Sequence, residues 1–431
     1  MVRIEIPYLD QALVLEIPDS NLLAVAEPNE FAAAAGPASL IDSALENPYG
    51  KAGSANVAGK NLASFLSGAR TVLVIVNDAT RPTPTEAILD GLLLAFSKAG
   101  IVLENITILI ATGAHRAPTE VEYKQILGHH HGELRKCCIA HDSRNDTEMV
   151  ELGHTRNGTP IVLNKLLFSS DRIIATGSVE PHYFAGFTGG RKAFLPGVAA
   201  YITIQANHKL ALSSKAHSLA LEGNPVHEDM MDALPLLKAP IFALMTVLDR
   251  DQAVAAATSG DLIASFHAAV STARKIFCVK IAAKADIVVS VARFPMDIDL
   301  YQSQKAIDNG AIALKDGGTL ILVSSCRDGI GDEAYASLLA SAASPQEAIT
   351  KIADGYKLGY HKAAKMAAVS ARAQVLAKTE LADERLRSMF IQPVSSLQEA
   401  VDTAIERALA EGVKTPKLLV LSDGCVTVPE I

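Results

Sequence analysis

Residues 71 to 99 read TVLVIVNDATRPTPTEAILDGLLLAFSKA, and they set out one strand followed by one helix. The first seven form a short run rich in β-branched side chains, which is typical of a buried strand. Pro82 and Pro84 fit a turn, and apolar side chains then recur at helical spacing over residues 85 to 99. A strand that leads through a polar turn into a helix is the unit from which parallel sheets with crossover helices are built.

The same alternation of a strand pattern with a helix pattern recurs along the rest of the chain. It predicts an α/β fold with mostly parallel sheets and flanking helices. Residues 1 to 20 alternate apolar and polar side chains, which predicts a β-hairpin, and the Ala-, Lys- and Glu-rich segment 343 to 386 predicts long helices. Further strands are expected at 106–112, 172–177, 241–248, 286–292, 319–325 and 417–422, and further helices at 261–275, 302–314 and 333–342.

The domain organisation follows from length and from where this alternation restarts. A chain of 431 residues, 49% of them apolar, has enough material for two domains. We expect an N-terminal α/β domain over residues 1–280 and a C-terminal α/β domain over 281–410, each with a mostly parallel sheet. The last strand, within 411–431, is expected to return and complete the first sheet. An active site is expected in the cleft between the domains.

Composition excludes several classes of partner. The formal net charge is -8 and the chain has no run of Lys and Arg, so neither nucleic acid nor an anionic membrane surface is expected to bind. No apolar run approaches the roughly 20 residues that span a bilayer. The five cysteines are sparse, odd in number and without metal-type spacing, which favours a reducing compartment. We therefore expect a soluble cytoplasmic protein.

Chemically reactive residues follow the predicted strands. Asp78 to Arg81 follow the strand at 71–77, His115 follows the strand at 106–112, and His182 and Lys192 follow the strand at 172–177. Ligands of parallel sheets bind at the carboxyl ends of the strands, where loops converge and helix N-termini favour anions. The placement predicts a site built from these loops.

Each of these residues also has an ordinary structural interpretation. Asp78 could cap a helix or pair with Arg81, and His115 and His182 could be hydrogen-bonded structural imidazoles. Two histidines on neighbouring loops could instead exchange protons with one carbon from opposite faces. Gln302 and Lys305, three apart on a predicted helix, suit a carboxylate ligand, although a solvated helix face is the simpler interpretation.

The surroundings of Lys192, His208 and the histidine triplet at 129–131 exclude or disfavour several kinds of site. The turn from Gly189 to Lys192 lacks the Walker spacing, which disfavours a nucleoside triphosphatase and leaves Lys192 as a charge partner, a Schiff-base amine or a covalent tether. His208 has no partner at the spacing of a zinc helix. The triplet 129–131, all histidine, falls in a polar turn and is expected to be solvent-exposed, with metal binding disfavoured.

Taken together, five segments resemble the nickel-pincer nucleotide-dependent lactate racemase family, whose order and spacing they match over nearly the whole chain. Each segment alone is modest, but their conjunction is highly specific. The segments are NDATRPTP (77–84), TGAHR (112–116), GSVEPHYFAGFTGGRKAFLPG (177–197), QANHK (205–209) and YQSQKA (301–306).

The resemblance implies a cofactor, the nickel pyridinium-3-thioamide-5-thiocarboxylic acid mononucleotide. It implies that this group is covalently bound to Lys192 and that His208 is the protein ligand to nickel, alongside two sulfurs and a ring carbon of the cofactor. The residues Asp78, Ala79, Thr80 and Arg81 match the family's cofactor-binding loop, with Arg81 also near the substrate.

The resemblance also implies an activity. His115 and His182 match the catalytic acid and base, while Gln302 and Lys305 match the pair that holds the substrate carboxylate. The implied reaction inverts the 2-carbon of a 2-hydroxy acid by moving hydride to the cofactor and back. The implied partners are the small substrate and cofactor-synthesis proteins. The particular acid (lactate, malate, a larger aliphatic acid or a sugar acid) and assembly into a homo-oligomer stay open.

Two other classes of protein use similar residues. A nicotinamide-dependent 2-hydroxyacid dehydrogenase would share the His, Arg and carboxylate-binding groups, but no G-x-G-x-x-G follows a predicted strand. A non-catalytic cofactor carrier would need Lys192 and His208 but not His115, His182 or the Gln302 and Lys305 pair. A racemase or epimerase is therefore the favoured interpretation.

Overall fold

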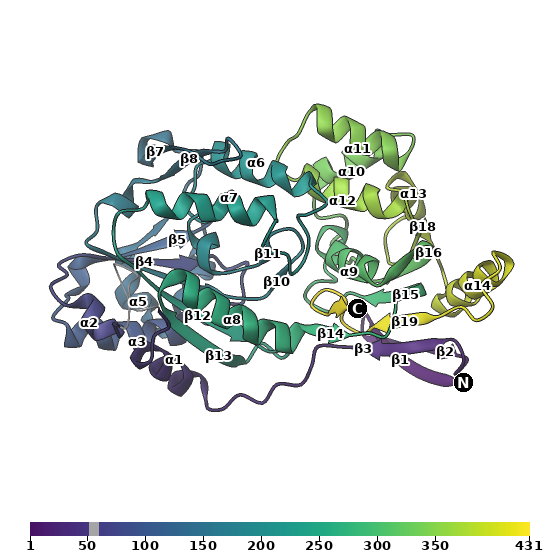
Figure 1. The fold of residues 1–431 in the computed structure, drawn as a ribbon, viewed down its shortest axis with the longest axis horizontal. Coiled ribbons are helices and arrows are strands. Elements are labelled where there is room, and N and C mark those ends of the chain that lie inside the picture. The colour runs from purple at the N-terminus through teal and green to yellow at the C-terminus, as the bar shows by residue number, and fades with distance from the viewer. Residues whose placement is uncertain (51–59) are drawn as a thin grey trace. The chain divides into compact units, whose positions relative to one another are not determined.

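The computed structural model describes residues 1–50 and 60–431, and it has an α/β fold. The chain forms two compact units (Figure 1). The central unit is Glu30–Ile276, and the terminal unit combines Met1–Asn29 with Phe277–Ile431. The change of unit after residue 276 lies near the expected boundary at 280. The first 29 residues, however, belong with the C-terminal part of the chain and not with residues 30–276.

The central unit is built on a six-stranded sheet in the order β13-β12-β9-β4-β5-β6. Neighbouring strands run parallel except β12 and β13, which are antiparallel. The strands predicted at 71–77, 106–112, 172–177 and 241–248 are confirmed. The strands are β4 (Val72–Asn77), β5 (Ile106–Ala111), β6 (Cys138–Ala140), β9 (Arg172–Ser178), β12 (Ile241–Leu248) and β13 (Val254–Gly260).

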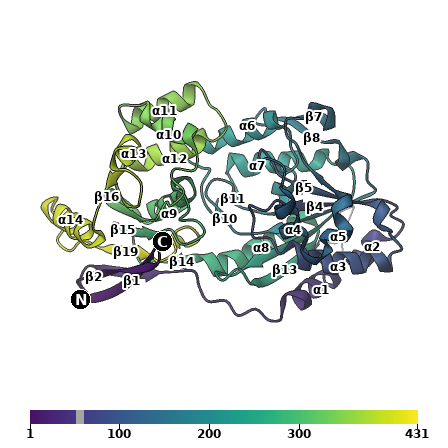
Figure 2. The same cartoon turned by 180° about the vertical axis from the view of Figure 1, so that it is seen from behind.

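Helices cover both faces of this sheet because its strands are apolar on both sides. On one face, alternate residues of β4 and β5 pack against the first five helices (Figure 2). On the other, Met245 of β12 accepts a hydrogen bond from Gly190 N, and Gly190 packs beneath Phe266 of α8. The helices are α1 (Pro37–Glu46), α2 (Leu62–Leu66), α3 (Thr85–Lys98), α4 (Glu120–Leu127), α5 (His131–Leu134), α6 (Tyr201–Lys209), α7 (Pro225–Ala233) and α8 (Leu262–Phe277).

Two small hairpins and several single turns complete the central unit. The hairpins are β7 (Met149–His154) with β8 (Pro160–Asn164), and β10 (Pro181–His182) with β11 (Gly186–Phe187). The short turns include η2 (Gly128–His130) and η6 (Gly190–Ala193), which carry His129 and Lys192.

The terminal unit has a second six-stranded sheet, in the order β18-β17-β16-β15-β19-β3, with every neighbouring pair parallel. The last strand of this sheet in the chain, β19, lies between β15 and β3, so the expectation that it returns to the first sheet was wrong. Its apolar run is buried between two parallel neighbours, one of them the unpredicted N-terminal strand β3. The strands are β3 (Leu22–Ala26), β15 (Ala285–Val291), β16 (Leu314–Val323), β17 (Gln374–Lys378), β18 (Gln392–Pro393) and β19 (Leu418–Leu421).

The expected N-terminal hairpin is confirmed as β1 (Val2–Tyr8) and β2 (Gln11–Ile17). Its inward side chains, with those of α14 (Leu397–Ala410), cover one face of the terminal sheet. A short parallel pair, β14 (Cys278–Lys280) with β20 (Val428–Glu430), adds to this unit. Its other helices are α9 (Leu300–Ile312), α10 (Glu333–Ala340), α11 (Pro345–Asp354), α12 (Tyr360–Ser370) and α13 (Asp383–Ser388).

The prediction of long helices over 343–386 was wrong. The segment holds α11, α12, the strand β17 and the start of α13. Gly355 stands at the end of α11, and Gly359 adopts a left-handed conformation just before α12 begins, so the helical pattern is interrupted. No helix within residues 1–50 and 60–431 has the length and apolarity needed to cross a membrane.

Candidate functional site

Two loops of the central unit meet through Asp78 and His115. Asp78 follows β4, His115 follows β5, and these strands are parallel neighbours, so their carboxyl ends share one edge. The His115 Nδ1 atom lies 2.7 Å from Asp78 Oδ2, while Asp78 Oδ1 accepts hydrogen bonds from the backbone N (3.2 Å) and Oγ1 (2.6 Å) of Thr80. The carboxylate is only 7% exposed, whereas the imidazole side chain is 55% exposed.

The electrostatics of this pair set its protonation. Burial by itself would raise the pKa of Asp78, but hydrogen bonds from His115 and Thr80, with the nearby charge of Arg81, lower the pKa overall. An ionised carboxylate can only accept hydrogen bonds, so Nδ1 of His115 carries the proton that lies between them. In the neutral imidazole, Nε2 is then a proton acceptor. The pair can therefore act as an oriented base.

His182, Lys192 and His208 gather around one aromatic ring, that of Phe184. The ring centroids of His182 and His208 lie 4.5 Å and 5.1 Å from the Phe184 centroid, both edge to face, and Lys192 Nζ lies 5.6 Å from it. Phe184 is 3% exposed, so it gives these polar groups a fixed apolar support. The sequence shows the aromatic residue beside His182 but not its contact with His208.

His182 is oriented by the hairpin that carries it. It ends β10, and its Nδ1 atom accepts hydrogen bonds from the backbone N–H groups of Ala185 (3.3 Å) and Phe184 (3.5 Å). Its ring also stacks on Tyr183 with centroids 5.0 Å apart. A neutral ring that accepts at Nδ1 carries its proton on Nε2. His182 and His115 are thus held as opposite tautomers.

His208, in the last turn of α6, is a neutral imidazole. Burial foremost, together with the charges of Lys192 and His115, lowers the pKa of His208 to about 3. A neutral imidazole is the form that ligates a metal, and imidazole suits nickel, copper and zinc.

The Gly189–Lys192 turn is held by internal packing. A Cβ atom at Gly189 would lie 2.5 Å from Val179 Cγ2, and one at Gly190 would lie 2.8 Å from the Phe266 ring. Arg191 is buried, and its guanidinium donates to the carbonyl oxygens of residues 185 (2.5 Å), 188 (3.5 Å) and 189 (3.3 Å). Neighbouring side chains therefore fill the space at this turn, and the Arg191 guanidinium already donates to protein carbonyl oxygens. Neither that space nor those donors are left to bind a phosphate.

The DATR turn, residues 78–81, is otherwise ordinary in its packing. The backbone N of Arg81 donates to Asp78 O (3.2 Å), Ala79 packs against the helix-side core, and Thr80 is exposed. The structure thus pairs Asp78 with His115 by hydrogen bond, and not with Arg81 as one interpretation of the sequence had it.

In the terminal unit, Gln302 and Lys305 lie on α9. The Asp299 side chain caps this helix by accepting from Gln302 N (2.6 Å), and Lys305 Nζ lies 3.2 Å from Met296 Sδ. The loops after β15 and β16 are joined by Asp297, which accepts from Ser325 Oγ (2.7 Å) and Arg327 (2.9 Å). Both predicted carboxylate-binding residues are half-buried beside this joined loop pair.

Lys362 is a buried amine that sequence reasoning missed. It is 3% exposed on α12, its Nζ donates to the Tyr301 carbonyl, and it lies 3.7 Å from the centroid of the Tyr301 ring. Burial foremost, together with the neighbouring charge of Lys305, lowers the pKa of Lys362 to about 7. Nothing distinguished this lysine from the others in the Ala- and Lys-rich segment around it.

A surface depression of about 570 Å³ lies elsewhere, beside Arg70, Asn105 and Asp171. These residues lie within two positions of the first residues of β4, β5 and β9, so the depression is at the amino edge of the central sheet. The reactive groups of the central unit described above follow the carboxyl ends of its strands, which is where ligands of parallel sheets bind. The depression is therefore not the candidate site.

The fold and these residues define an α/β protein with a histidine- and lysine-lined site at the carboxyl edge of a parallel sheet. The lactate racemase N-terminal domain model matches residues 8–219, and the lactate racemase C-terminal domain model matches residues 280–428. The chain is 32% identical to the lactate racemase of Thermoanaerobacterium thermosaccharolyticum, over 94% of each chain. It is 30% identical to the lactate racemase of Lactiplantibacillus plantarum, over 98% of this chain and 99% of that one.

Solved structures agree with these matches. The lactate racemase apoprotein of T. thermosaccharolyticum superposes with a TM-score of 0.89 at 30% identity, covering 100% of both chains. A protein from Thermotoga maritima superposes with a TM-score of 0.64 at 17% identity, over 86% of this chain and 96% of that one, which shows the fold alone. This chain belongs to the lactate racemase family.

Proposed function

We propose that this protein is a racemase, an isomerase that inverts the 2-carbon of lactate or a closely related 2-hydroxy acid. The observation that carries the proposal is the gathering of His115, His182, Lys192 and His208 at one sheet edge in a member of this family. Two relatives that match nearly the full chain are named lactate racemase. A site with two differently protonated histidines suits a reaction that takes up and returns a proton.

We also infer that the resident group is the nickel-pincer nucleotide, joined covalently to Lys192, with His208 as the protein ligand to nickel. Two features of the residues fit this group. His208 is a neutral imidazole, and both its ring and the Lys192 amine lie against the Phe184 ring. When bound, the group would supply an acceptor for the hydride that leaves the substrate's 2-carbon. The turn from Asp78 to Arg81 is inferred to hold the group, with Arg81 also reaching the substrate.

The two histidines would both act on the substrate hydroxyl. His115 Nε2 accepts its proton, and the ionised Asp78 stabilises the imidazolium that forms. His182 Nε2–H donates a hydrogen bond to the same oxygen, and the His115 imidazolium returns its proton to that oxygen when the 2-carbon regains its hydrogen on the opposite face. For the other enantiomer the same steps run in the opposite direction. Phe184 keeps water from the side of the site that it covers.

The substrate carboxylate would be held by α9. Lys305 supplies an ammonium group and Gln302 an amide, and their spacing places them on the same side of the helix. Lys362 adds a second amine near Lys305. We further propose that the protein works in the cytoplasm and acquires its cofactor from cofactor-synthesis proteins.

The test is a chiral-product screen of the holoprotein made together with cofactor-synthesis proteins. Each enantiomer of lactate, malate and larger 2-hydroxy acids is incubated, and both enantiomers are quantified. We expect inversion of at least one acid in both directions. Substrate deuterated at the 2-carbon should give product that keeps the label, because the hydrogen moves as hydride. Loss of the label to water, or no inversion by protein that carries the Lys192 adduct, would contradict the proposal.

A further inference from the structure

We propose that Asp90, His129 and His130 form a second metal site, which binds a divalent transition-metal cation such as Zn²⁺. The three residues lie on the helix-covered face of the central sheet that holds α3, whereas Lys192 lies on the other face. The site does not depend on the proposed function. It was disfavoured by the sequence, because a histidine triplet in a polar turn does not show which acidic residue it will meet.

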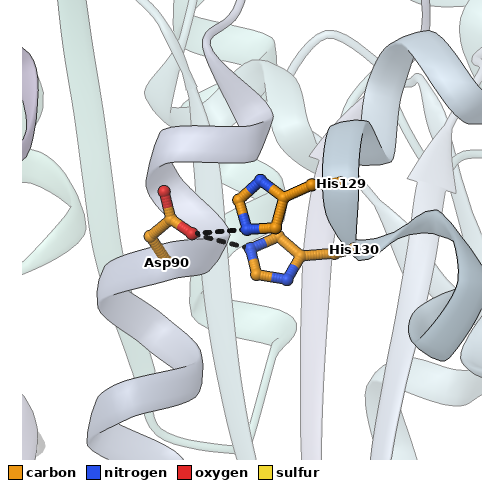
Figure 3. A group of neighbouring side chains, drawn as sticks. All are labelled: Asp90, His129 and His130. Atoms are coloured by element: carbon orange, nitrogen blue, oxygen red, sulfur yellow. Dashed lines mark hydrogen bonds and ion pairs between the residues drawn. The ribbon is translucent and has the colours of Figure 1, made fainter.

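The three ligand atoms converge. Asp90 Oδ1 lies 2.8 Å from His130 Nε2 and 3.2 Å from His129 Nε2, and all three atoms lie within 4.8 Å of one another (Figure 3). A tetrahedral Zn²⁺ with bonds of 2.0–2.2 Å places its ligand atoms about 3.3 Å apart. A cation at the centre of this group therefore needs only small shifts of the exposed Asp90 and His129 side chains around the mostly buried His130.

Local structure explains why these side chains meet. Glu86 and Asp90 are four apart on α3, so they face the same way. The helix α4 ends at Gly128, which has a φ of +55°, and the η2 turn then presents two successive histidine rings with centroids 3.9 Å apart. A Cβ atom at Gly128 would collide with the Glu86 carboxylate. Glycine is thus required for Glu86 to reach over the turn.

Glu86 supplies an independent argument for a cation. Its Oε1 atom accepts hydrogen bonds from the backbone N (2.9 Å) and from Nδ1 (2.6 Å) of His129. A carboxylate on the far nitrogen of a histidine is the usual support of a metal-ligating imidazole. It fixes the proton on Nδ1 and turns the Nε2 lone pair toward Asp90.

In that orientation two hydrogen-bond acceptors, His129 Nε2 and the Asp90 carboxylate oxygen, face each other. A neutral His129 ring directs its Nε2 lone pair at the Asp90 carboxylate oxygen 3.2 Å away. The contact is favourable only when a positive charge lies there, either a second ring proton or a metal cation. Two imidazoles with one carboxylate are a donor set suited to Zn²⁺, with water completing the coordination at this partly exposed position.

The site would join two helices that follow catalytic loops. Asp90 lies on α3, which comes after the turn carrying Asp78, and the η2 histidines come after α4, which follows the loop carrying His115. A cation held by both would pin α3 to the end of α4. Its expected effect is on the stability of the central unit, since none of its ligands touches the proposed reacting groups.

The test is a titration of chelator-treated, full-length protein with zinc chloride by calorimetry near neutral pH, paired with thermal unfolding. We expect wild-type protein to bind Zn²⁺ at this site and to unfold at a higher temperature with the metal. Asp90→Asn and His129→Ala should each lose that binding event. Glu86→Gln should weaken it by about 10- to 100-fold, the usual effect of losing a supporting partner.

Matched variants separate this site from other imidazoles. His154→Ala removes an exposed histidine elsewhere on the central unit, and His208→Ala removes the imidazole of the proposed cofactor site. Both should keep the binding event that Asp90→Asn loses. Because Asp90→Asn is isosteric and exposed, it keeps the test valid even if His129→Ala unfolds. Equal zinc binding by Asp90→Asn and wild type, or no zinc binding by wild type, would overturn the proposal.

Discussion

The Nδ1 atom of His115 lies 2.7 Å from Oδ2 of Asp78, a hydrogen bond between two loops whose residues are 37 positions apart in the chain. The bond joins a buried carboxylate to an exposed imidazole, so the acid anchors the ring and the ring faces outward. It assigns to Asp78 a contact with the predicted base, beyond the cofactor-binding role implied by the family resemblance.

The first prediction concerns this bond. Asp78→Asn keeps the shape of the side chain but removes the charge that stabilises the His115 imidazolium. We expect kcat for racemisation to fall by about 10² to 10⁴, the range of a general acid–base contribution, with a smaller change in KM. The measurement is the initial rate of racemisation in each direction, with the two enantiomers quantified by chiral chromatography. Glu122→Gln, which removes the charged partner of neighbouring Arg116, is the control and should retain activity. A rate for Asp78→Asn within twofold of wild type would separate Asp78 from the chemistry.

The second prediction concerns the two histidines. His115→Ala and His182→Ala should each lower racemisation by about 10² to 10⁴, because the first removes the group that moves the hydroxyl proton and the second removes the hydrogen bond to the same oxygen. Both proteins should still carry the cofactor adduct in an intact-mass spectrum. His154→Ala, at an exposed histidine on β7, should match wild type. Wild-type rates in either site variant would remove that histidine from the mechanism.

The third prediction concerns the tether. Lys192→Ala should abolish the covalent adduct, since no other amine takes its place at the η6 turn, and nickel should be lost with it. Lys209→Ala changes an exposed lysine near His208 and should keep the adduct. Intact mass and metal content are measured on proteins made alongside the cofactor-synthesis proteins. An undiminished adduct in Lys192→Ala would place the attachment elsewhere.

The fourth prediction concerns the binding of the substrate carboxylate by Lys305. Lys305→Met has a similar length but no charge, and it should raise KM by about tenfold or more, because a hydrogen bond to a charged group contributes roughly 1.5–3 kcal/mol. Steady-state kinetics with lactate measure the change, with Lys351→Met on α11 as the control. An unchanged KM for Lys305→Met would leave the carboxylate to other residues.

The fifth prediction concerns pH and stability. His227 is 7% exposed, and burial, with the charge of Arg191 next, lowers its pKa from 6.5 to about 3. Between these values the unfolded chain binds a proton that the folded protein does not, so the free energy of unfolding falls as pH falls. One such group contributes a slope of about 1.4 kcal/mol per pH unit. His227→Gln should therefore lose stability less steeply in acid, as measured by urea unfolding at several pH values. Parallel curves for the two proteins would rule out this linkage.

Much of the framework could be predicted from sequence. Strands such as β4 and β5 are continuous β-branched runs, and periodicity alone finds such runs. The strand β17 was missed because QVLAK sits in a segment of helix-forming composition. The place of β19 was predicted wrongly because strand partners depend on tertiary packing, and its partner β3 carried no signal of its own.

The candidate site, too, could be predicted from the sequence only in part. Its loops could be located from strand ends, but the Asp78 to His115 hydrogen bond required the register of β4 against β5. The meeting of Asp90 with His130, 40 positions away, depends on where α4 ends, and Lys362 was one lysine among many. Such pairings between elements are set by packing, which a single sequence does not display.

The pairing of β3 with β19 carries a consequence for biosynthesis. Leu22–Ala26 leaves the ribosome early, and Leu418–Leu421 follows almost four hundred codons later. At 5–20 residues per second this delay is roughly 20–80 s. During this time the central unit can fold, while the apolar face of the N-terminal hairpin stays exposed to solvent. Nascent chains that stall before codon 418 would therefore be natural clients of chaperones.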